Sequence, residues 1–276
     1  MADADAGEQP NALEAMDSLR LAADGKRIAV FLDYDGTLAP IVADPSRAFM
    51  SASMKDVVAA VAHAFPTAIV SGRSVEKLRT FIGLKELVYV GSHGLDIRLN
   101  GEADAAEEHI VAPEARPRLE AALCELAGRL DDIAGATLED NHLCVSVHYR
   151  HVAEERRGDV EAAVDAICEA DPGLVKKRGL LVWELRPRVE WGKGHALAFL
   201  LEALGLDDEG VLPVYLGDDV SDEDAFARLR SLGRGIGVCV GPTSRDTAAH
   251  YRLADVGDVE RYLRALLDLK GSVAAT

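Results

Sequence analysis

Positive charge is scarce in this sequence. Of its 276 residues, 30 are Lys or Arg and 47 are Asp or Glu, which leaves a formal net charge of −17 at pH 7. Proteins that bind nucleic acid usually present a basic surface, and proteins held at anionic membranes carry polybasic segments. The acidic balance therefore argues against both classes. Long apolar runs are missing as well, because no segment approaches the ~20 residues that a membrane-spanning helix needs.

Cysteine is rare and scattered. The four residues Cys124, Cys144, Cys168 and Cys239 form no Cys-x-x-Cys pair and lie in apolar stretches, which is typical of buried thiols in a reducing compartment. The N-terminal residues have neither the basic start nor the apolar centre of a secretory signal. We therefore expect a soluble, cytoplasmic protein.

Hydrophobic residues make up 49% of the chain, enough to build a large core and to exclude disorder. Apolar runs alternate with segments of helical periodicity. The runs cover residues 27–33, 67–70, 87–90, 212–217 and 235–240, and the helical segments cover 53–65, 75–81, 193–204, 222–232 and 258–269. This alternation predicts an α/β fold with a doubly wound, Rossmann-like core.

The rhythm changes in the middle of the chain. Strands are expected at 109–112, 136–139, 143–149, 174–177 and 180–185, with helices at 113–130 and 154–169. Hairpins with two helices predict a smaller α+β domain, inserted into the core, whose sheet is covered by helices on one face. We expect a core of residues 1–104 and 186–276 and an inserted domain of residues 105–185. Residues 1–24 are expected to form a loose arm or a short helix.

Two acidic motifs directly follow apolar runs. They are Asp33-Tyr34-Asp35-Gly36-Thr37 and Gly217-Asp218-Asp219-Val220-Ser221-Asp222-Glu223-Asp224. Ligands of open α/β sheets bind at the carboxyl ends of the strands, where these motifs stand. Asp218 and Asp219 have no evident structural role, and neighbouring carboxylates repel one another unless they meet a cation. Oxygen ligands of this kind favour Mg²⁺.

Two smaller signals lie between the acidic motifs. Ser71-Gly72-Arg73 follows the run at 67–70, so its hydroxyl and backbone N–H groups can face the same cleft. Lys193 opens a predicted helix, where the helix dipole opposes a cation and a nearby anion is needed. Either signal alone is explained by a turn or a solvated charge. Their order along the chain makes coincidence a poor explanation.

In this order the four motifs resemble those of the haloacid dehalogenase-like phosphohydrolases. More narrowly, the chain is similar to the trehalose-6-phosphate phosphatase family, in which an α/β cap is inserted between the Ser and Lys motifs. The segments that carry this similarity are Phe31 to Leu38, Ser71 to Arg73, Gly91 to Gly94, His148 to Arg150, Glu184 to Pro187 and Gly217 to Phe226. Small departures stand at Gly192, where Asn is frequent, and at Val220 and Ser221, where a basic residue and Thr are frequent.

The resemblance implies hydrolysis of trehalose 6-phosphate to trehalose and phosphate, through an aspartyl-phosphate on Asp33. Asp35 would act as general acid and base, and Lys193 would complete the catalytic set. The resemblance places Mg²⁺ at the Asp33 carboxylate, the Asp35 backbone carbonyl and the Asp218 carboxylate. Asp219 and Asp222 would hold metal-bound waters or orient Lys193. The phosphoryl group would be bound by Thr37, Ser71, Gly72 and Lys193.

The cap is expected to supply sugar recognition, since carboxylates and cations in a cleft can bond several hydroxyls. The candidates are Arg73, His93, Glu139, His148, Arg150, Lys176, Arg178 and Glu184. A small-molecule sugar phosphate is the expected partner, with no nucleic acid, membrane or obligate protein partner.

Other functions remain open at this point. A phosphatase for another sugar phosphate, such as that of sucrose or mannosylglycerate, could share the same motifs. A phosphomutase would need a second phosphate site in the cap. A nucleotide-sugar transferase would explain Asp33 and Asp35 but not Lys193 or the second acidic motif. A non-catalytic domain is disfavoured because every expected catalytic position is filled.

Overall fold

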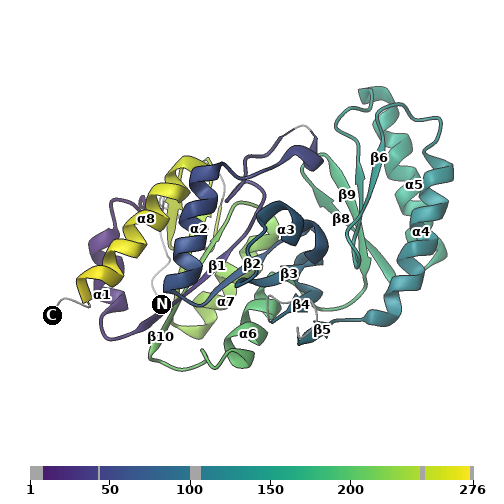
Figure 1. The fold of residues 1–276 in the computed structure, drawn as a ribbon. Helices are drawn as coiled ribbons and strands as arrows, with labels where there is room; N and C mark the ends of the chain where they lie inside the picture. Colours follow the sequence, from purple (N-terminus) through teal and green to yellow (C-terminus); the bar gives the residue numbers. More distant parts are fainter. Residues whose placement is uncertain (1–8, 43, 100–106, 243–245, 274–276) are drawn as a thin grey trace, which may run out of the picture.

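The computed structural model describes residues 9–42, 44–99, 107–242 and 246–273, which form two sheets and their covering helices (Figure 1). The strands are β1 Arg27–Leu32, β2 Thr67–Val70, β3 Val88–Gly91, β4 Asp96–Arg98, β5 Glu108–Ile110, β6 Thr137–Asp140, β7 Val145–His148, β8 Leu174–Gly179, β9 Val182–Pro187, β10 Val211–Gly217, β11 Ile236–Val240 and β12 Tyr251–Leu253. The α-helices are α1 Met16–Ala23, α2 Ala52–Ala64, α3 Val75–Ile82, α4 Arg116–Arg129, α5 Arg157–Ala170, α6 Lys193–Ala203, α7 Glu223–Leu232 and α8 Val256–Val273.

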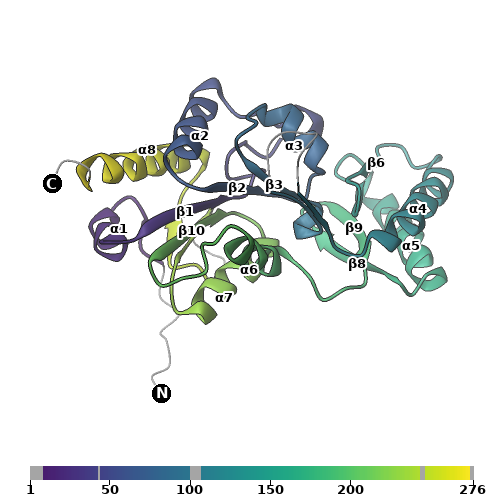
Figure 2. The ribbon, with the colours of Figure 1, turned by 60° about the horizontal axis from the view of Figure 1, so that its bottom comes forward.

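The larger sheet has eight strands in the order β12-β11-β10-β1-β2-β3-β4-β5. From β12 to β3 the pairing is parallel, and β4 and β5 add antiparallel strands at one edge. Helices α2, α3 and α8 cover one face, and α6 and α7 cover the other (Figure 2). Because both faces are covered, β10 is buried along its whole length. The predicted doubly wound α/β core is confirmed.

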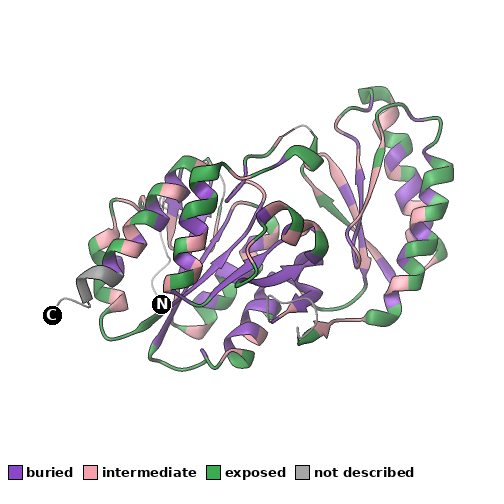
Figure 3. Cartoon of the chain, viewed as in Figure 1, coloured by how far each residue is buried: buried purple, intermediate pink, exposed green. Residues whose placement is uncertain are grey.

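The smaller sheet, which we call the cap sheet, contains β6-β7-β9-β8 in that order, and all its pairings are antiparallel. Helices α4 and α5 cover its outer face, around a core that includes Leu126, Val147 and Val164. Its other face is turned toward the larger sheet (Figure 1). Side chains in these strands are less uniformly buried than those in the larger sheet (Figure 3). An antiparallel sheet with helices on one face is the arrangement predicted for the inserted segment.

One predicted strand has a different place from the one expected. The strand expected at 109–112 was assigned to the inserted domain, but β5 pairs with β4 and extends the larger sheet. The chain therefore leaves the larger sheet after Ile110, beyond the expected boundary at residue 104. Pairing partners decide this assignment, and a three-residue strand does not reveal its partner by periodicity.

Two strands were not predicted, whereas the helix near the N-terminus was one of two alternatives. Strands β4 and β12 have only three residues each. Helix α1 is one of the two alternatives expected for residues 1–24, and it buries Leu19 in the core. Ahead of it, Asn11 forms a bridge with Arg252 of β12, so this part of the expected loose arm is tied to the sheet edge. Residues 1–8 lie outside the described part of the chain.

In the described ranges no helix combines the length and the apolar character required to cross a membrane.

Candidate active site

The first acidic motif forms a tight loop at the carboxyl end of β1. The N–H of Asp33 still donates to the carbonyl of Leu216, so Asp33 is held in line with the strand, and only 4% of the residue is exposed. Gly36 then adopts a φ of 82°, a left-handed conformation that suits glycine. The loop therefore turns back directly after the two aspartates and keeps them at the sheet edge.

The second acidic motif lies against this loop. A Cβ added to Gly36 would overlap the Asp218 carboxylate, so the two motifs are in direct contact because residue 36 has no side chain. One carboxylate oxygen from each of Asp33, Asp218 and Asp222 lies within 4.8 Å of the others. Burial and the charge of Asp222 raise the pKa of Asp218 to about 7. The pKa of Asp33 is also raised, by burial and despite the opposing charge of Lys193.

Lys193 lies between two of these carboxylates. Its Nζ donates to Asp33 Oδ1 at 2.8 Å and to Asp222 Oδ1 at 2.7 Å, and its side chain is 2% exposed. Burial alone would lower the pKa of Lys193, but Asp222 and Asp33 outweigh it and raise the pKa well above the usual value. Lys193 is thus a buried, fully charged ammonium group beside the predicted nucleophile.

Two further acids of the second motif, Asp222 and Asp219, have distinct structural roles. Asp222 accepts hydrogen bonds from Lys193 and from the Tyr215 hydroxyl, both at 2.7 Å, so it orients the lysine. Asp219 is exposed and caps the 3-10 helix Val220–Asp222 through reciprocal side chain–backbone bonds with Asp222. The expectation that Asp219 had no structural role is therefore wrong: it caps a helix.

The predicted phosphate ligands face the same loop region. The Thr37 hydroxyl is buried, and among the described residues it has no hydrogen-bond partner. An unpartnered buried hydroxyl is costly unless a ligand satisfies it. Ser71 is 1% exposed, and its Oγ accepts from the N–H of Arg73 at 3.3 Å. At Gly72 a Cβ would overlap the His93 ring, so glycine allows the imidazole to lie against this loop.

Arg73 was predicted to bind sugar, but its guanidinium is engaged elsewhere. Its Nε and Nη2 donate to the two oxygens of Asp35, each at 2.7 Å, and Nη2 also donates to the carbonyl of Pro45 at 2.9 Å. The guanidinium lies 4.9 Å from the centre of the Phe81 ring, and 6% of the residue is exposed. Arg73 therefore positions the predicted acid Asp35 and does not belong to the sugar-facing set.

Four predicted sugar ligands gather between the cap sheet and the larger sheet. Glu184 accepts from the ring Nε2 of His93, 2.9 Å from its Oε1, and Glu139 lies 2.9 Å from Nε2 of His148. His93 belongs to the core side, after β3, whereas the other three are on the cap sheet. Burial alone would raise the pKa of Glu139, but the bonds from His148 and Lys77 lower it to about 2.

The other three candidates do not join this group. Lys176 bonds to Glu161 of α5 at 2.9 Å and lies over the ring of Trp183, on the face covered by helices. Arg178 is paired directly with Trp183 and shares that face. Arg150 reaches the carbonyl of Leu180 at 3.5 Å, beyond the end of β7. We correct the prediction for Lys176 and Arg178, because strand register sends them away from the larger sheet.

Several residues of the region were missed from the sequence. Lys77 of α3 donates to Glu139, to the carbonyl of Asp140 and to Asn141 Oδ1, so it joins the core to the cap sheet. Asn141 also accepts from the N–H of Ser74, the residue that caps α3. Lys77 lies four residues beyond the Ser-Gly-Arg motif, on the first turn of a predicted helix. The position of Lys77 close to this motif was a usable signal that it lies near the site. Its partners Glu139, Asp140 and Asn141 are distant in sequence, so the contacts themselves could not be predicted.

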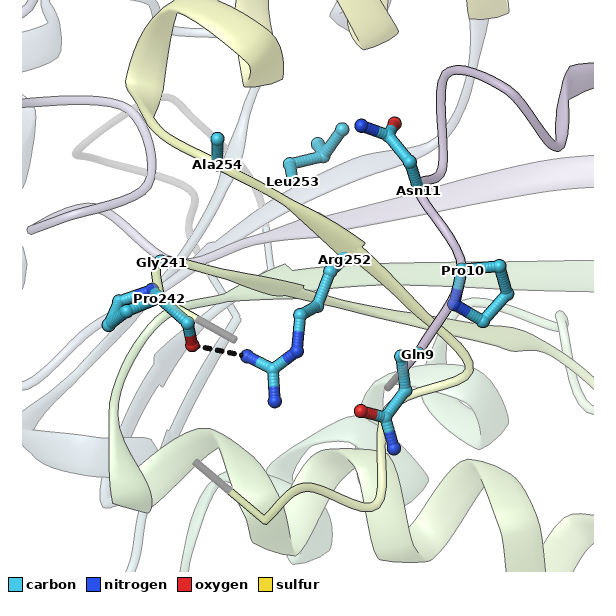
Figure 4. Close-up of a pocket in the computed structure, with 8 residues that line it drawn as sticks. All are labelled: Gln9, Pro10, Asn11, Gly241, Pro242, Arg252, Leu253 and Ala254. Carbon is cyan, nitrogen blue, oxygen red and sulfur yellow. Dashed lines mark hydrogen bonds between the residues drawn. The ribbon is translucent and has the colours of Figure 1, made fainter. Parts of the chain in front are cut away.

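A separate cavity opens at the other edge of the larger sheet. It has a volume of about 550 Å³ and lies between the segment Gln9 to Asn11, the end of β11 and strand β12 (Figure 4). The Arg252 guanidinium projects into this region and donates to the carbonyl of Pro242 (Figure 4). None of the residues predicted for catalysis or for binding lines this cavity.

Comparisons with known proteins agree with this geometry. The family model described as trehalose-phosphatase matches residues 31–257. The sequence is 45% identical to a probable trehalose-phosphate phosphatase 3 of Oryza sativa subsp. japonica, over 95% of this chain and 75% of that protein. It is 44% identical to trehalose 6-phosphate phosphatase RA3 of Zea mays, over 98% of this chain and 79% of that protein.

A solved structure shows that the fold is shared as well. The C-terminal domain of trehalose-6-phosphate phosphatase from C. albicans aligns with a TM-score of 0.77 at 22% identity, covering 95% of this chain and 99% of that domain. The family match spans all four motifs and both sheets. This chain therefore belongs to the trehalose-phosphatase family.

Proposed function

We propose that this protein is a Mg²⁺-dependent phosphatase that converts trehalose 6-phosphate to trehalose and inorganic phosphate through an aspartyl-phosphate. The observation that carries the proposal is the buried contact of Lys193 with both Asp33 and Asp222, together with a buried Thr37 hydroxyl that has no hydrogen-bond partner within the described ranges. A charged amine and a hydroxyl donor around a carboxylate suit transfer of a phosphoryl group. The names of the relatives support trehalose 6-phosphate as the substrate.

Two aspartates have separate chemical roles in this proposal, Asp33 as nucleophile and Asp35 as general acid and base. A carboxylate oxygen of Asp33 forms a bond to phosphorus while the bond from phosphorus to the sugar oxygen breaks, and Asp35 gives its proton to that oxygen. Asp35 then takes a proton from a water molecule whose oxygen attacks the aspartyl-phosphate, which releases phosphate and restores Asp33. Because Arg73 binds both oxygens of Asp35, this ion pair must open before Asp35 can carry a proton to the sugar.

The acidic cluster fits a hard dication. The carboxylates of Asp33 and Asp218, with the backbone carbonyl of Asp35, would hold Mg²⁺. Only oxygen donors are offered, and the raised pKa values of Asp33 and Asp218 reflect burial and crowding of negative charge that a cation relieves. When bound, the ion would neutralise charge on the phosphoryl oxygens. Asp222 is committed to Lys193, so we assign it to orienting that lysine.

The cap sheet supplies the sugar-binding surface in this proposal. Glu139, His148 and Glu184 of the cap sheet, together with His93 of the core, offer carboxylate and imidazole groups between the two sheets. Lys77 and Arg186 bond to Glu139 and Glu184 and hold these carboxylates ionised at neutral pH. Fixed acceptors of this kind can bind several sugar hydroxyls together.

We also infer a reducing, cytoplasmic setting, because all four cysteines are free and Cys124 is exposed.

The test is phosphate release from a panel of sugar phosphates, each assayed with Mg²⁺ and with a chelator. Trehalose 6-phosphate should be turned over fastest, and chelation should abolish the activity. Faster turnover of another disaccharide phosphate would replace the substrate assignment and keep the reaction class. Full activity in the presence of the chelator would refute the metal assignment.

Gly36→Ala is expected to lower Mg²⁺ affinity, and with it phosphate release at limiting Mg²⁺, by about 10- to 100-fold. The new Cβ overlaps the Asp218 carboxylate and displaces it from Asp33. Titration of activity against Mg²⁺ concentration measures the effect. Gly25→Ala is a matched control, because Gly25 has a φ of 69° but nothing within 4 Å of the added Cβ. If both variants behave alike, backbone strain and not the displacement of Asp218 is responsible.

Glu184→Gln should raise KM for trehalose 6-phosphate about tenfold or more, because a hydrogen bond to a charged group contributes roughly 1.5–3 kcal/mol. Lys176→Met, on the helix-covered face of the same sheet, should leave KM within about twofold, as expected for a partly exposed pair. Steady-state kinetics with trehalose 6-phosphate measures KM for both variants. A larger KM change in the Lys176 variant than in the Glu184 variant would contradict the assignment of the sugar site to the face that carries Glu184.

A further inference from the structure

Three side chains of different chemistry meet where the cap sheet faces the core. One potential ligand atom from each of His93, Cys144 and Glu184 lies within 4.8 Å of the others. His93 belongs to the core, whereas Cys144 immediately precedes β7 and Glu184 lies on β9. Cys144 is fully buried, and His93 is 7% exposed. We propose that these residues form a second cation site, specific for a thiophilic transition metal such as Zn²⁺.

The donor set distinguishes this cluster from the acidic one. Zn²⁺ accepts nitrogen, sulfur and oxygen ligands, and some of its sites have three protein ligands and an open fourth position. Mg²⁺ has no preference for sulfur or nitrogen and would remain with the oxygen ligands of Asp33 and Asp218. The two sites therefore select different ions by chemistry, although both lie near the boundary between the two sheets.

The geometry of His93 fixes which ring nitrogen can serve as the ligand. Nε2 faces Glu184 and is the nitrogen available to a shared ion, whereas Nδ1 is buried without a hydrogen-bond partner among the residues that the structure describes. The backbone also holds this residue under strain, since Ser92 and His93 have φ values of 49° and 58°. Non-glycine residues keep such conformations only where the surrounding structure imposes them, and they cluster at functional sites.

Arg186 lies against both Glu184 and Cys144 and opposes a second cation, whereas burial and the charges of Arg186 and Lys193 lower the pKa of His93 and keep its ring in the neutral form that a ligand needs. Arg186 bonds to Oε2 of Glu184, which leaves Oε1, the atom now facing His93, for the ion. The Cys144 thiol would lose its proton to solvent, and the resulting thiolate and the Glu184 carboxylate would balance the two charges of the metal. Burial raises the pKa of this thiol, so the metal must displace the proton. Ligand atoms around zinc lie about 3.3–3.8 Å apart, so His93 Nε2 and Glu184 Oε1, now 2.9 Å apart, must separate slightly to admit the ion.

Metal in this site would have a consequence for activity that rests on the proposed function. It would join His93 of the core to the cap sheet and occupy Glu184, a proposed sugar ligand. Zn²⁺ should therefore inhibit phosphate release in the presence of saturating Mg²⁺, through restricted opening of the cap and loss of a sugar contact.

The direct test uses Co²⁺ as a spectroscopic probe, added to the whole protein in excess Mg²⁺. A thiolate-to-cobalt charge-transfer band should rise to one equivalent, which no all-oxygen site can produce. Cys144→Ser should abolish the band, and His93→Gln should weaken Co²⁺ binding by about 10- to 100-fold. Cys239→Ser, at a buried cysteine of β11, is the matched control and should retain the band. Circular dichroism checks that each variant is folded.

Absence of the band in the wild-type protein, or its persistence in folded Cys144→Ser, would overturn the proposal. So would its loss in Cys239→Ser. This measurement needs no substrate, so it stands even if trehalose 6-phosphate is not hydrolysed. Where activity is present, Cys144→Ser should raise the Zn²⁺ concentration for half inhibition at least tenfold, and an unchanged value would refute the inhibitory role.

Discussion

Replacing Asp33 by Asn should reduce phosphate release from trehalose 6-phosphate by about 10⁴-fold or more, the size of effect seen when a catalytic nucleophile is removed. Asn has nearly the same shape as Asp but cannot form the aspartyl-phosphate. The assay is release of inorganic phosphate under saturating Mg²⁺, followed long enough to measure a residual rate.

The same variant should remain folded, and this separates chemistry from stability. Asp33 is buried beside Asp218 and Asp222, and burial and these charges raise its pKa. Removing one negative charge relieves repulsion, although it also removes one partner of Lys193. We therefore expect a thermal midpoint close to that of the wild type. A folded variant with unchanged turnover would exclude Asp33 as the nucleophile.

Replacing Lys193 by Met should destabilise the protein by about 3–5 kcal/mol, the typical cost of leaving buried charges without their partner. The ammonium group is 2% exposed and bonds to Asp33 and Asp222 at 2.8 and 2.7 Å. Met fills a similar volume but leaves both carboxylates uncompensated. Urea unfolding measures the stability, and phosphate release should be lost at the same time because the proposed donor to the phosphoryl oxygens is gone.

A second substitution distinguishes charge compensation from packing. Asp222→Asn in the Lys193→Met background should recover part of the stability, because one of the two uncompensated carboxylates is removed. It should recover no activity. Lys55→Met, at an exposed position on α2, is the control and should change stability by less than about 0.5 kcal/mol. Strictly additive effects of the two substitutions at 193 and 222 would contradict the assigned ion pair.

The candidate active site could be predicted from the sequence because its motifs are local and their positions follow a simple rule. Asp33 and Asp218 directly follow buried apolar strands, β1 and β10. Those strands are parallel neighbours, so their carboxyl ends meet at the same edge of the sheet. The contact of the two motifs through Gly36 was therefore implied, although the overlap that a Cβ would cause was not.

The proposed sugar-binding surface was harder to predict because a strand has two faces. Lys176 and Arg178 alternate with Lys177 along β8, and only pairing with Glu184 or with Trp183 decides which face each one occupies. The paired residues are Lys177 with Glu184 and Arg178 with Trp183. A shift of one residue in register would exchange the two faces. Sequence alternation alone left that choice open.

The sequence by itself determined the α/β class and the inserted segment and located the acidic motifs whose aspartates we propose to be catalytic, because apolar runs, helical periodicity and motif order are local properties. Only the tertiary structure decided that Arg73 holds Asp35, that Asp219 caps a helix, and that β5 belongs to the larger sheet. It also brought His93 of the core to Cys144 and Glu184 of the cap sheet. These contacts join residues whose pairing depends on strand register, chain reversal and the docking of one sheet against another, and no local pattern encodes them.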